Sequence, residues 1–241
     1  RFSVKEKCYI GENVFGEINR ENPLGRGIRF GIAEQNMAMM SVGMTMDRLP
    51  GGFAPISVFS SYAVFTSMMT NCVRLGLIGN HLNPKTKGFF IMLAAHDGPE
   101  TGEDGPTHQG LYWMSMFNAY PGIKVYKPLD ANEMIEMLFY ALEKGEPIAL
   151  SAVRPDMMVF KRNNGTPPAK EATNGAYVFY TTPNTELRTP NSNVVLVVCG
   201  GQTMANTMEA VPELEKQGLD VKIVAVTSPQ LFEELRKNNP E

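Results

Sequence analysis

The sequence predicts a doubly wound α/β domain built on a parallel sheet, followed by part of a second α/β domain. Short apolar runs alternate with amphipathic segments, and this alternation is typical of βα units with parallel strands. Prolines, threonines and asparagines interrupt the pattern over 163–192, and the pattern begins again at 193. We therefore expect a first domain over 1–162 with an atypical beginning, a linker over 163–192, and the start of a second domain over 193–241.

Helices and strands follow from this periodicity. In the first domain we expect strands at 28–32, 53–59, 89–95, 123–127 and 148–153, and helices at 33–47, 60–77, 111–117 and 131–143. Ser60 or Ser61 is a candidate N-cap, Gly79 a candidate C-cap, and Asp130 the predicted N-cap of the fourth helix. Further on we expect a possible strand at 176–180, strands at 194–198 and 220–226, and helices at 203–217 and 230–237.

Charge and composition exclude several classes of partner. The chain of 241 residues carries 22 basic and 25 acidic side chains, a net charge of −3, so it shows no basic surface for nucleic acid. It contains no apolar run of the roughly 20 residues needed to span a membrane. Cys8, Cys72 and Cys199 have no metal-ligand spacing and suggest a reducing, cytoplasmic location. Because the first residue is Arg1, we expect a piece of a longer protein.

The most informative stretch is 96–109, between the predicted strand 89–95 and the predicted helix 111–117. In open α/β sheets, ligands bind at loops that follow the carboxyl ends of strands. His96 and His108, two of the three histidines in the chain, lie at the two ends of this stretch, with four carboxylates between them. An acidic surface loop would explain the carboxylates but not both histidines, which favours a functional site.

Three other features leave two interpretations open. Glu34 lies in the first turn of a predicted helix and is either a helix-stabilising acid or a functional one. Tyr62, Phe65 and Met69 form an apolar stripe, which is more often core than a binding surface. Gly200-Gly201 follows a strand and either forms a tight turn, the favoured interpretation, or binds a phosphate.

Four segments in order carry a resemblance to a known family. Gly102-Glu103-Asp104-Gly105-Pro106-Thr107-His108-Gln109 resembles a motif of transketolases. The segments 31–37 (GIAEQNM), 60–65 (SSYAVF) and 154–156 (RPD) are similar to three further transketolase segments. The chain thus resembles the pyrimidine-binding domain of transketolases, an enzyme family that depends on thiamine diphosphate. The part after 193 resembles the beginning of the family's C-terminal domain more loosely.

The resemblance implies a role for each matching residue. Glu34 would be the buried acid that hydrogen-bonds N1′ of the thiamine pyrimidine and so activates the cofactor. The aromatic patch of Tyr62 and Phe65, with Met68 in place of a further aromatic residue, would hold the pyrimidine ring. His108 would act as general acid and base and stabilise an oxyanion, and Asp104 would bind a substrate hydroxyl. His96, also a candidate catalytic residue, and Arg154 would hold the substrate phosphate.

The resemblance also implies partners that this chain does not contain. The expected cofactors are thiamine diphosphate and Mg²⁺, with no metal ligand in this chain, because in the family they lie on a diphosphate-binding domain from the other subunit of a dimer. The implied activity is transfer of a two-carbon ketol unit between sugar phosphates in the pentose phosphate pathway. We therefore expect a homodimer, or a complex with a diphosphate-binding domain or subunit. The region before Ile28 departs from the family.

Two alternatives remain from the sequence. The chain could belong to another thiamine diphosphate enzyme, such as 1-deoxyxylulose-5-phosphate synthase, the β part of a 2-oxo acid dehydrogenase or a formaldehyde transketolase. His96 and His108-Gln109 favour the sugar-phosphate branch. A non-catalytic subunit that keeps the fold is the second alternative, although Glu34 and both loop histidines are present.

Overall fold

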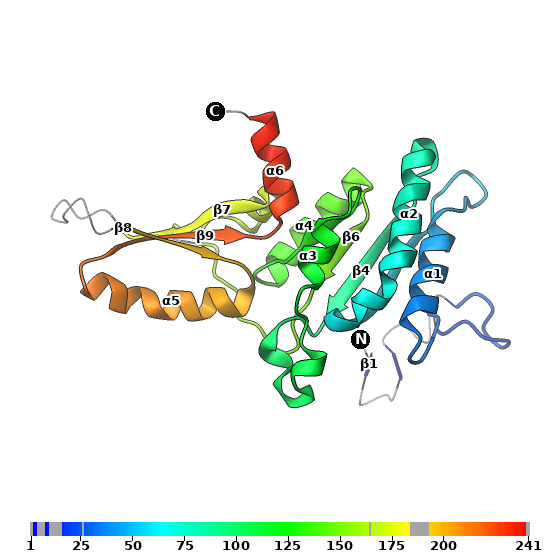
Figure 1. Cartoon of the computed structure of the whole chain (residues 1–241), viewed down its shortest axis with the longest axis horizontal. Helices are drawn as coiled ribbons and strands as arrows, with labels where there is room; N and C mark the ends of the chain where they lie inside the picture. Colours follow the sequence, from blue (N-terminus) through cyan, green and yellow to red (C-terminus); the bar gives the residue numbers. More distant parts are fainter. Residues whose placement is uncertain are drawn as a thin grey trace.

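Two β-sheets lie side by side in the computed structural model, and each is accompanied by helices (Figure 1). The structure describes residues 2–3, 8–9, 16–25, 27–163, 165–183 and 193–239. The short strands β1 (Phe2–Ser3) and β2 (Cys8–Tyr9) form a separate antiparallel pair near the amino terminus.

The first sheet has the strand order β3-β4-β6-β5, and all of its strands are parallel. Its strands are β3 (Ile56–Tyr62), β4 (Phe89–Ala95), β5 (Lys124–Tyr126) and β6 (Ile148–Ser151). Its helices are α1 (Glu34–Thr45), α2 (Thr70–Leu82), α3 (Trp113–Asn118) and α4 (Ala131–Lys144), with a 3₁₀ segment η1 (Ala63–Met69) before α2. Parallel strands with helices on both faces confirm the predicted doubly wound fold.

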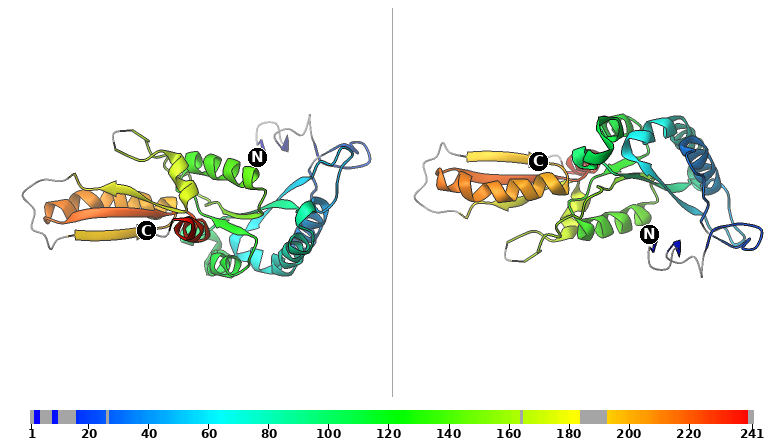
Figure 2. Two further views of the ribbon diagram at one scale, coloured as in Figure 1. Left: turned by 90° about the horizontal axis from the view of Figure 1, so that it is seen from above. Right: turned by 90° about the horizontal axis from the view of Figure 1, so that it is seen from below.

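Alternation along β4 separates the two cores of this sheet. Phe90, Met92 and Ala94 face a core shared with α1, α2 and α3, whereas Phe89 and Ile91 face a core shared with α4. Successive side chains of a strand point to opposite faces, so a central strand covered on both faces must be apolar throughout. Figure 2 shows α3 and α4 on opposite sides of this sheet. This core position holds the carboxyl end of β4 firmly beneath the loop that follows it.

The second sheet has the order β7-β9-β8 and packs against α4 through the second core. Its strands are β7 (Ala176–Thr181), β8 (Asn193–Val198) and β9 (Asp220–Val226), and its helices are α5 (Gly201–Lys216) and α6 (Pro229–Asn238). β7 confirms the possible strand at 176–180, and it comes from the segment predicted as a linker. The boundaries of the two domains stay a prediction.

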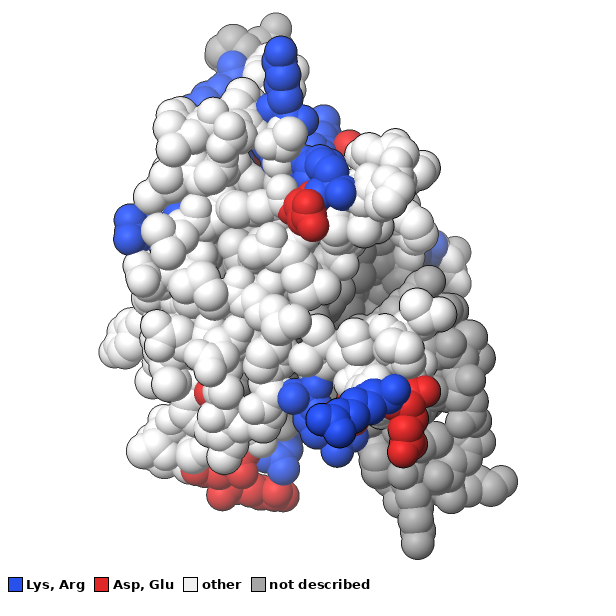
Figure 3. Space-filling model, turned by 90° about the vertical axis from the view of Figure 1, so that its right-hand side faces the viewer, with Lys and Arg blue, Asp and Glu red and all other residues white. Residues whose placement is uncertain are grey.

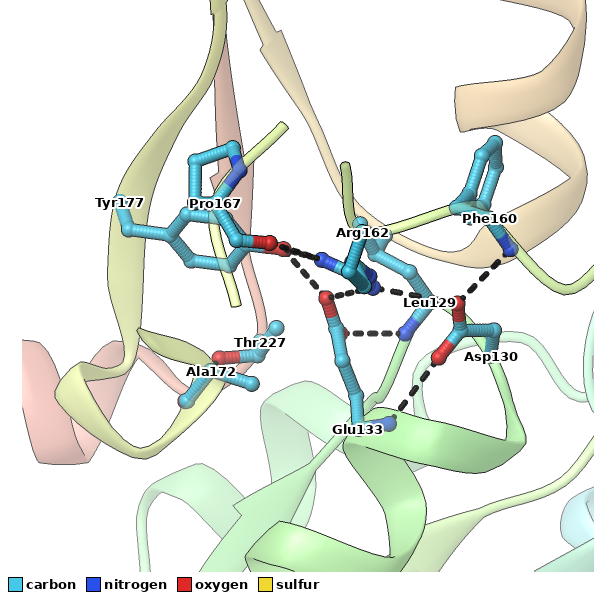
Figure 4. Close-up of polar contacts among 9 residues, drawn as sticks. All are labelled: Leu129, Asp130, Glu133, Phe160, Arg162, Pro167, Ala172, Tyr177 and Thr227. Atoms are coloured by element: carbon cyan, nitrogen blue, oxygen red, sulfur yellow. Dashed lines mark hydrogen bonds and ion pairs between the residues drawn. The ribbon is translucent and has the colours of Figure 1, made fainter. Parts of the chain in front are cut away.

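A buried charge cluster joins the two sheets (Figure 4). Arg162 pairs with Asp130 at 3.1 Å and with Glu133 at 2.8 Å, and both carboxylate side chains are 0% exposed. The hydroxyl of Tyr177, on β7, donates to Glu133 and accepts from Arg162. Burial raises the pKa of Glu133, and hydrogen bonds from Tyr177, Leu129 and Arg162 oppose that rise. The cluster therefore ties α4 in the first domain to β7 in the second sheet.

Some of the predicted helices, strands and caps are confirmed, and others are wrong. Asp130 caps α4 as predicted, since its side chain accepts from the backbone N–H of Glu133. The predicted strand 28–32 is absent among the described residues, and Ile32 is 99% exposed. Ser60 and Ser61 belong to β3 rather than capping a helix, because β3 stays paired with β4 as far as Tyr62 and Ala95.

Glycines lie at two close contacts between segments, one at a predicted helix end and one at a predicted turn. Gly79 does not end α2, which continues to Leu82. A Cβ at Gly79 would lie 2.6 Å from Met46 Cε, and one at Gly76 would lie 2.5 Å from Val42 Cγ1, so both glycines permit close packing against the α1 segment. Gly200 likewise lies against Lys127, and Gly201 against the Leu129 carbonyl. These contacts support the tight-turn interpretation of Gly200-Gly201, because protein atoms occupy the adjacent space.

Candidate functional site

The candidate site lies at the carboxyl edge of the first sheet, where three neighbouring strands end. Tyr62 ends β3 and pairs with Ala95, which ends β4, so Tyr62 and His96 are adjacent at this edge. β6 ends at Ser151, and Arg154 follows it after a short turn. Parallel strands direct all of these ends to one edge, which is where open α/β sheets bind ligands.

Four rings form an aromatic cluster at this edge. The centroid of Tyr62 lies 4.0 Å from that of His96 and 5.9 Å from that of His108. Phe65 lies 5.4 Å from His108, nearly edge-on, and 5.9 Å from Tyr62. All four side chains are half-buried. The fold thus brings both histidines of the 96–109 stretch onto the predicted aromatic patch, although they are separated by more than ten residues in sequence.

Glu34 lies next to this cluster through Ser61. It is the first residue of α1, where the positive end of the helix dipole favours a carboxylate. Ser61 Oγ donates to Glu34 Oε1 at 3.1 Å, and Ser61 directly precedes Tyr62 in β3. Glu34 is half-buried. A carboxylate, a hydroxyl and a half-exposed aromatic ring therefore lie side by side at one end of the cluster.

Arg154 forms a second ionic group beside the loop. Its guanidinium lies 2.7 Å from Asp104 Oδ2 and 3.3 Å from Glu103 Oε2. These contacts hold η3 (Pro99–Asp104), a 3₁₀ segment within the loop, against the chain that follows β6. Glu103 is 88% exposed, whereas Asp104 is 29% exposed, so the arginine keeps access to solvent.

His96 has the most constrained environment in the cluster. Its backbone is left-handed with φ 53°, which a non-glycine residue adopts only where its surroundings require it. Its Nδ1 is buried and has no hydrogen-bond partner among the residues that the structure describes. Burial lowers the pKa of His96, and the nearby charge of Arg154 lowers it further, with Asp104 acting in the opposite direction. The folded environment therefore favours the neutral form of this imidazole.

His108 is held in the ring cluster by a neighbouring side chain, whereas Met68 is mostly exposed. Nδ1 of His108 lies 3.0 Å from Thr107 Oγ1, within η4 (Pro106–His108), which orients the ring toward Phe65 and Tyr62. Met68, the third predicted ring-holding residue, is 55% exposed on η1. The structure thus brings Tyr62, Phe65 and the two histidines together, with Glu34 beside them. Met68 is more exposed than these residues.

Sequence reasoning missed the polar residues beneath the loop. Asp97 is 1% exposed and accepts hydrogen bonds from Trp113, Lys127 and Ser151. Ser61, which contacts Glu34, lies in a segment that resembles transketolases but has no predicted role beyond a candidate helix cap. Asp97 stands two residues after a fully apolar strand, but only its contacts with Trp113, Lys127 and Ser151 account for its burial, since a carboxylate is buried only when donors surround it.

Residues 11–158 match the family described as "Transketolase, pyrimidine binding domain". Transketolase 10 of Craterostigma plantagineum is 29% identical over 94% of this chain and 31% of its own length. The transketolase of Aquifex aeolicus is 27% identical over 91% of this chain and 29% of its own length. The chain therefore spans about a third of the length of the curated relatives it matches.

Solved structures share the fold. Transketolase from Leishmania mexicana superposes with a TM-score of 0.71 at 23% identity, over 90% of this chain and 29% of that protein. A split-gene transketolase, described as an inactive β4 tetramer, gives a TM-score of 0.54 at 20% identity, over 88% of this chain and 60% of that protein. The parallel sheet fits a doubly wound pyrimidine-binding domain. Within that class, the chain belongs to the transketolase pyrimidine-binding domain family.

Proposed function

We propose that this chain supplies the pyrimidine-binding half of a transketolase active site. The complete enzyme would transfer a two-carbon ketol unit from a ketose phosphate to an aldose phosphate, as in the pentose phosphate pathway. The observation that carries this proposal is the meeting of Glu34, Tyr62, Phe65, His96 and His108 at the carboxyl edge of one sheet. These residues come from three separate stretches of the sequence, and the transketolase resemblance assigns a role to each.

The residues present fit the pyrimidine end of thiamine diphosphate. An aminopyrimidine needs an acid at its ring nitrogen and apolar contacts on its faces. Glu34 would provide the acid, while Tyr62, Phe65 and Met68 would contact the ring. When bound, the cofactor supplies a carbon nucleophile for the ketose carbonyl. We propose that the diphosphate and Mg²⁺ are held by a separate diphosphate-binding domain, and no metal-binding group of three or more His, Cys, Asp or Glu occurs within the described residues.

The remaining predicted residues would contact the substrate rather than the cofactor. His108, oriented by Thr107, would give or take protons at sugar oxygens and stabilise an oxyanion. His96 and Arg154 would bind the terminal phosphate, where the planar guanidinium can pair with two oxygens. Asp104, already beside Arg154, would accept from a sugar hydroxyl. A Pichia stipitis transketolase solved in complex with sedoheptulose 7-phosphate supports sugar phosphates as the substrate class.

A partner subunit would complete this site, and α1 supports that part of the proposal. Figure 3 shows that the side of the molecule where α1 lies is largely uncharged. Met39, Met40 and Met44 of α1 are 44–45% exposed, and neighbouring exposed apolar side chains of this size are typical of an interaction surface. We propose that a second subunit covers this face in a dimer.

Within the described residues, no helix has the length and apolar character that a membrane span requires. The free thiols of Cys72 and Cys199 support a cytoplasmic location.

Glu34→Gln tests the function directly in the assembled protein with thiamine diphosphate and Mg²⁺. Ketol transfer should fall by roughly 10²- to 10⁴-fold, the range typical of a lost acid–base group. Glu143→Gln, an exposed carboxylate on α4 at the opposite face of the sheet, is the matched control and should keep full activity. Near-normal ketol transfer by Glu34→Gln would show that the proposed function is wrong.

Met40→Glu tests the proposed partner face. A buried charge without a partner should weaken subunit association by about 3–5 kcal/mol, measured by sedimentation equilibrium. Leu142→Glu, at a residue that is 43% exposed on α4, controls for the added surface charge and should leave association unchanged. If Met40→Glu assembles as tightly as the unaltered protein, α1 is not the face between subunits.

A further inference from the structure

Asp97 lies directly beneath the loop that carries both histidines, and its carboxylate is almost completely buried. Its side chain is 2% exposed. Oδ1 accepts from Trp113 Nε1 at 2.8 Å, while Oδ2 accepts from Lys127 Nζ at 2.8 Å and from Ser151 Oγ at 2.6 Å. Its backbone N–H donates to the Ala152 carbonyl at 3.1 Å. Hydrogen bonds to an ionised acceptor are short and strong, so these donors fix the carboxylate in one position.

The donors come from three different parts of the first domain. Ser151 ends β6, Lys127 follows β5, and Trp113 begins α3 immediately after the loop. A Cβ at Gly110 would lie 2.7 Å from Asp97 Oδ1 and 2.7 Å from Ala63 Cβ, so the returning chain passes directly over the carboxylate. Asp97 therefore holds both the beginning and the end of the segment between His96 and Trp113.

This arrangement accounts for the unfavourable backbone of His96. Ala95 is fixed on one side by its pairing with Tyr62 in β3, and Asp97 is fixed on the other side by its four hydrogen bonds. His96 lies between these two fixed residues with φ 53°. The resulting direction of its side chain brings the imidazole within 4.0 Å of the Tyr62 ring.

We propose that Asp97 is a positioning residue that sets the placement of both His96 and His108 against Tyr62. It acts on His96 through the adjoining backbone, and on His108 through Gly110 and Trp113 at the far end of the loop. Lys127 extends the connection to the second sheet, since its side chain packs on Gly200 between β8 and α5. The consequence for activity rests on the proposed function, whereas the placement of the imidazoles does not.

The test compares Asp97→Asn with Asp130→Asn in the assembled protein. Both aspartates are buried, and each accepts hydrogen bonds from donors on more than one element. Asp97 pairs with Lys127, and Asp130 pairs with Arg162. Asp130 belongs to the Arg162 cluster rather than to the loop. Because the chain has only three histidines, selective ¹³C labelling of histidine gives resolvable ring signals. Ring currents from Tyr62 make those signals sensitive to small displacements.

Asp97→Asn should shift or broaden the signals of His96 and His108 and leave that of His81 unchanged. Asp130→Asn should lower the unfolding temperature without moving any loop histidine. In the assembled enzyme, Asp97→Asn should reduce kcat/KM by roughly 10²-fold, as expected when reacting groups move by about 1 Å. Lys127→Met, Ser151→Ala and Trp113→Phe each remove one donor and should give smaller shifts of the same signals. They also keep the test informative if Asp97→Asn fails to fold.

Unchanged His96 and His108 signals in Asp97→Asn, or in all three single-donor variants, would show that Asp97 only stabilises the core. That outcome would overturn the proposal even if ketol transfer is confirmed. Conversely, if Glu34→Gln retains activity, the proposed function fails while the histidine signals still decide the role of Asp97.

Discussion

Arg162 and Arg154 each pair with two carboxylates, but the two clusters have opposite environments. The contacts of Arg162 with Asp130 and Glu133 are drawn in Figure 4. The side chain of Arg162 is 12% exposed, and those of both partners are 0% exposed. Arg154 is 35% exposed, and its partners Glu103 and Asp104 are 88% and 29% exposed. The same chemical groups therefore occur once within the contact between two sheets and once at the rim of the candidate site.

This difference separates a structural ion cluster from one available to a ligand. Removing one partner from a buried pair leaves an uncompensated charge, whereas an exposed pair exchanges readily with water. The buried carboxylates also accept from backbone N–H groups of Leu129, Glu133 and Phe160, which no ligand could replace without unfolding. The Arg154 cluster is more open to solvent, so under the proposed function Arg154 would exchange its carboxylates for a substrate phosphate.

The largest expected effect is on stability at the buried cluster. Glu133→Ala should lower the free energy of unfolding by about 3–5 kcal/mol, because Arg162 and Tyr177 lose their shared acceptor. Glu103→Ala, at the exposed cluster, should change it by about 0–1 kcal/mol. Urea unfolding of both variants measures the contrast. Equal losses would mean that burial does not distinguish the two clusters.

The next effect is on substrate binding at the exposed cluster. Arg154→Ala should raise KM for a phosphorylated acceptor by roughly 10- to 100-fold, since a hydrogen bond to a charged group contributes about 1.5–3 kcal/mol. Its unfolding free energy should change little. Arg74→Ala, an exposed arginine on α2, is the control and should leave KM unaltered. The decisive result is a rise in KM for phosphorylated substrates alone. An equal rise in KM for an unphosphorylated sugar would contradict the role of Arg154.

The smallest effect concerns the titration of His96. Burial and then Arg154 lower its pKa below the ordinary value of 6.5, so folding favours the neutral ring. The contribution of the neutral His96 ring to the free energy of unfolding is thus fully present above pH 6.5. It is lost as the pH falls through the lowered pKa. Arg154→Ala should raise that pKa toward 6.5 in an NMR titration, and the Arg154→Lys variant, which keeps the charge, should not. No change on loss of Arg154 would show that burial alone lowers the pKa.

Much of the first domain could be predicted because local pattern and tertiary environment agree there. Helix α4 has its cap at Asp130 and an apolar face that packs into the core, and it begins at the predicted residue. The candidate site residues were predicted from the two histidines of the 96–109 stretch and from the family motifs, and their roles stay a prediction. The extension of β3 through Ser60 and Ser61 was missed, because hydroxyl side chains cap helices as readily as they pair within strands.

The sequence by itself determined the order of strands and helices and the residues that could carry the chemistry. Both are encoded locally, in apolar periodicity and in the types of side chain that follow each strand. Only the tertiary structure decided which polar residues lie buried beneath the site, such as Asp97, and which arginine is enclosed by its partners and which is accessible. Burial depends on contacts between segments far apart in the chain, and no local pattern specifies them.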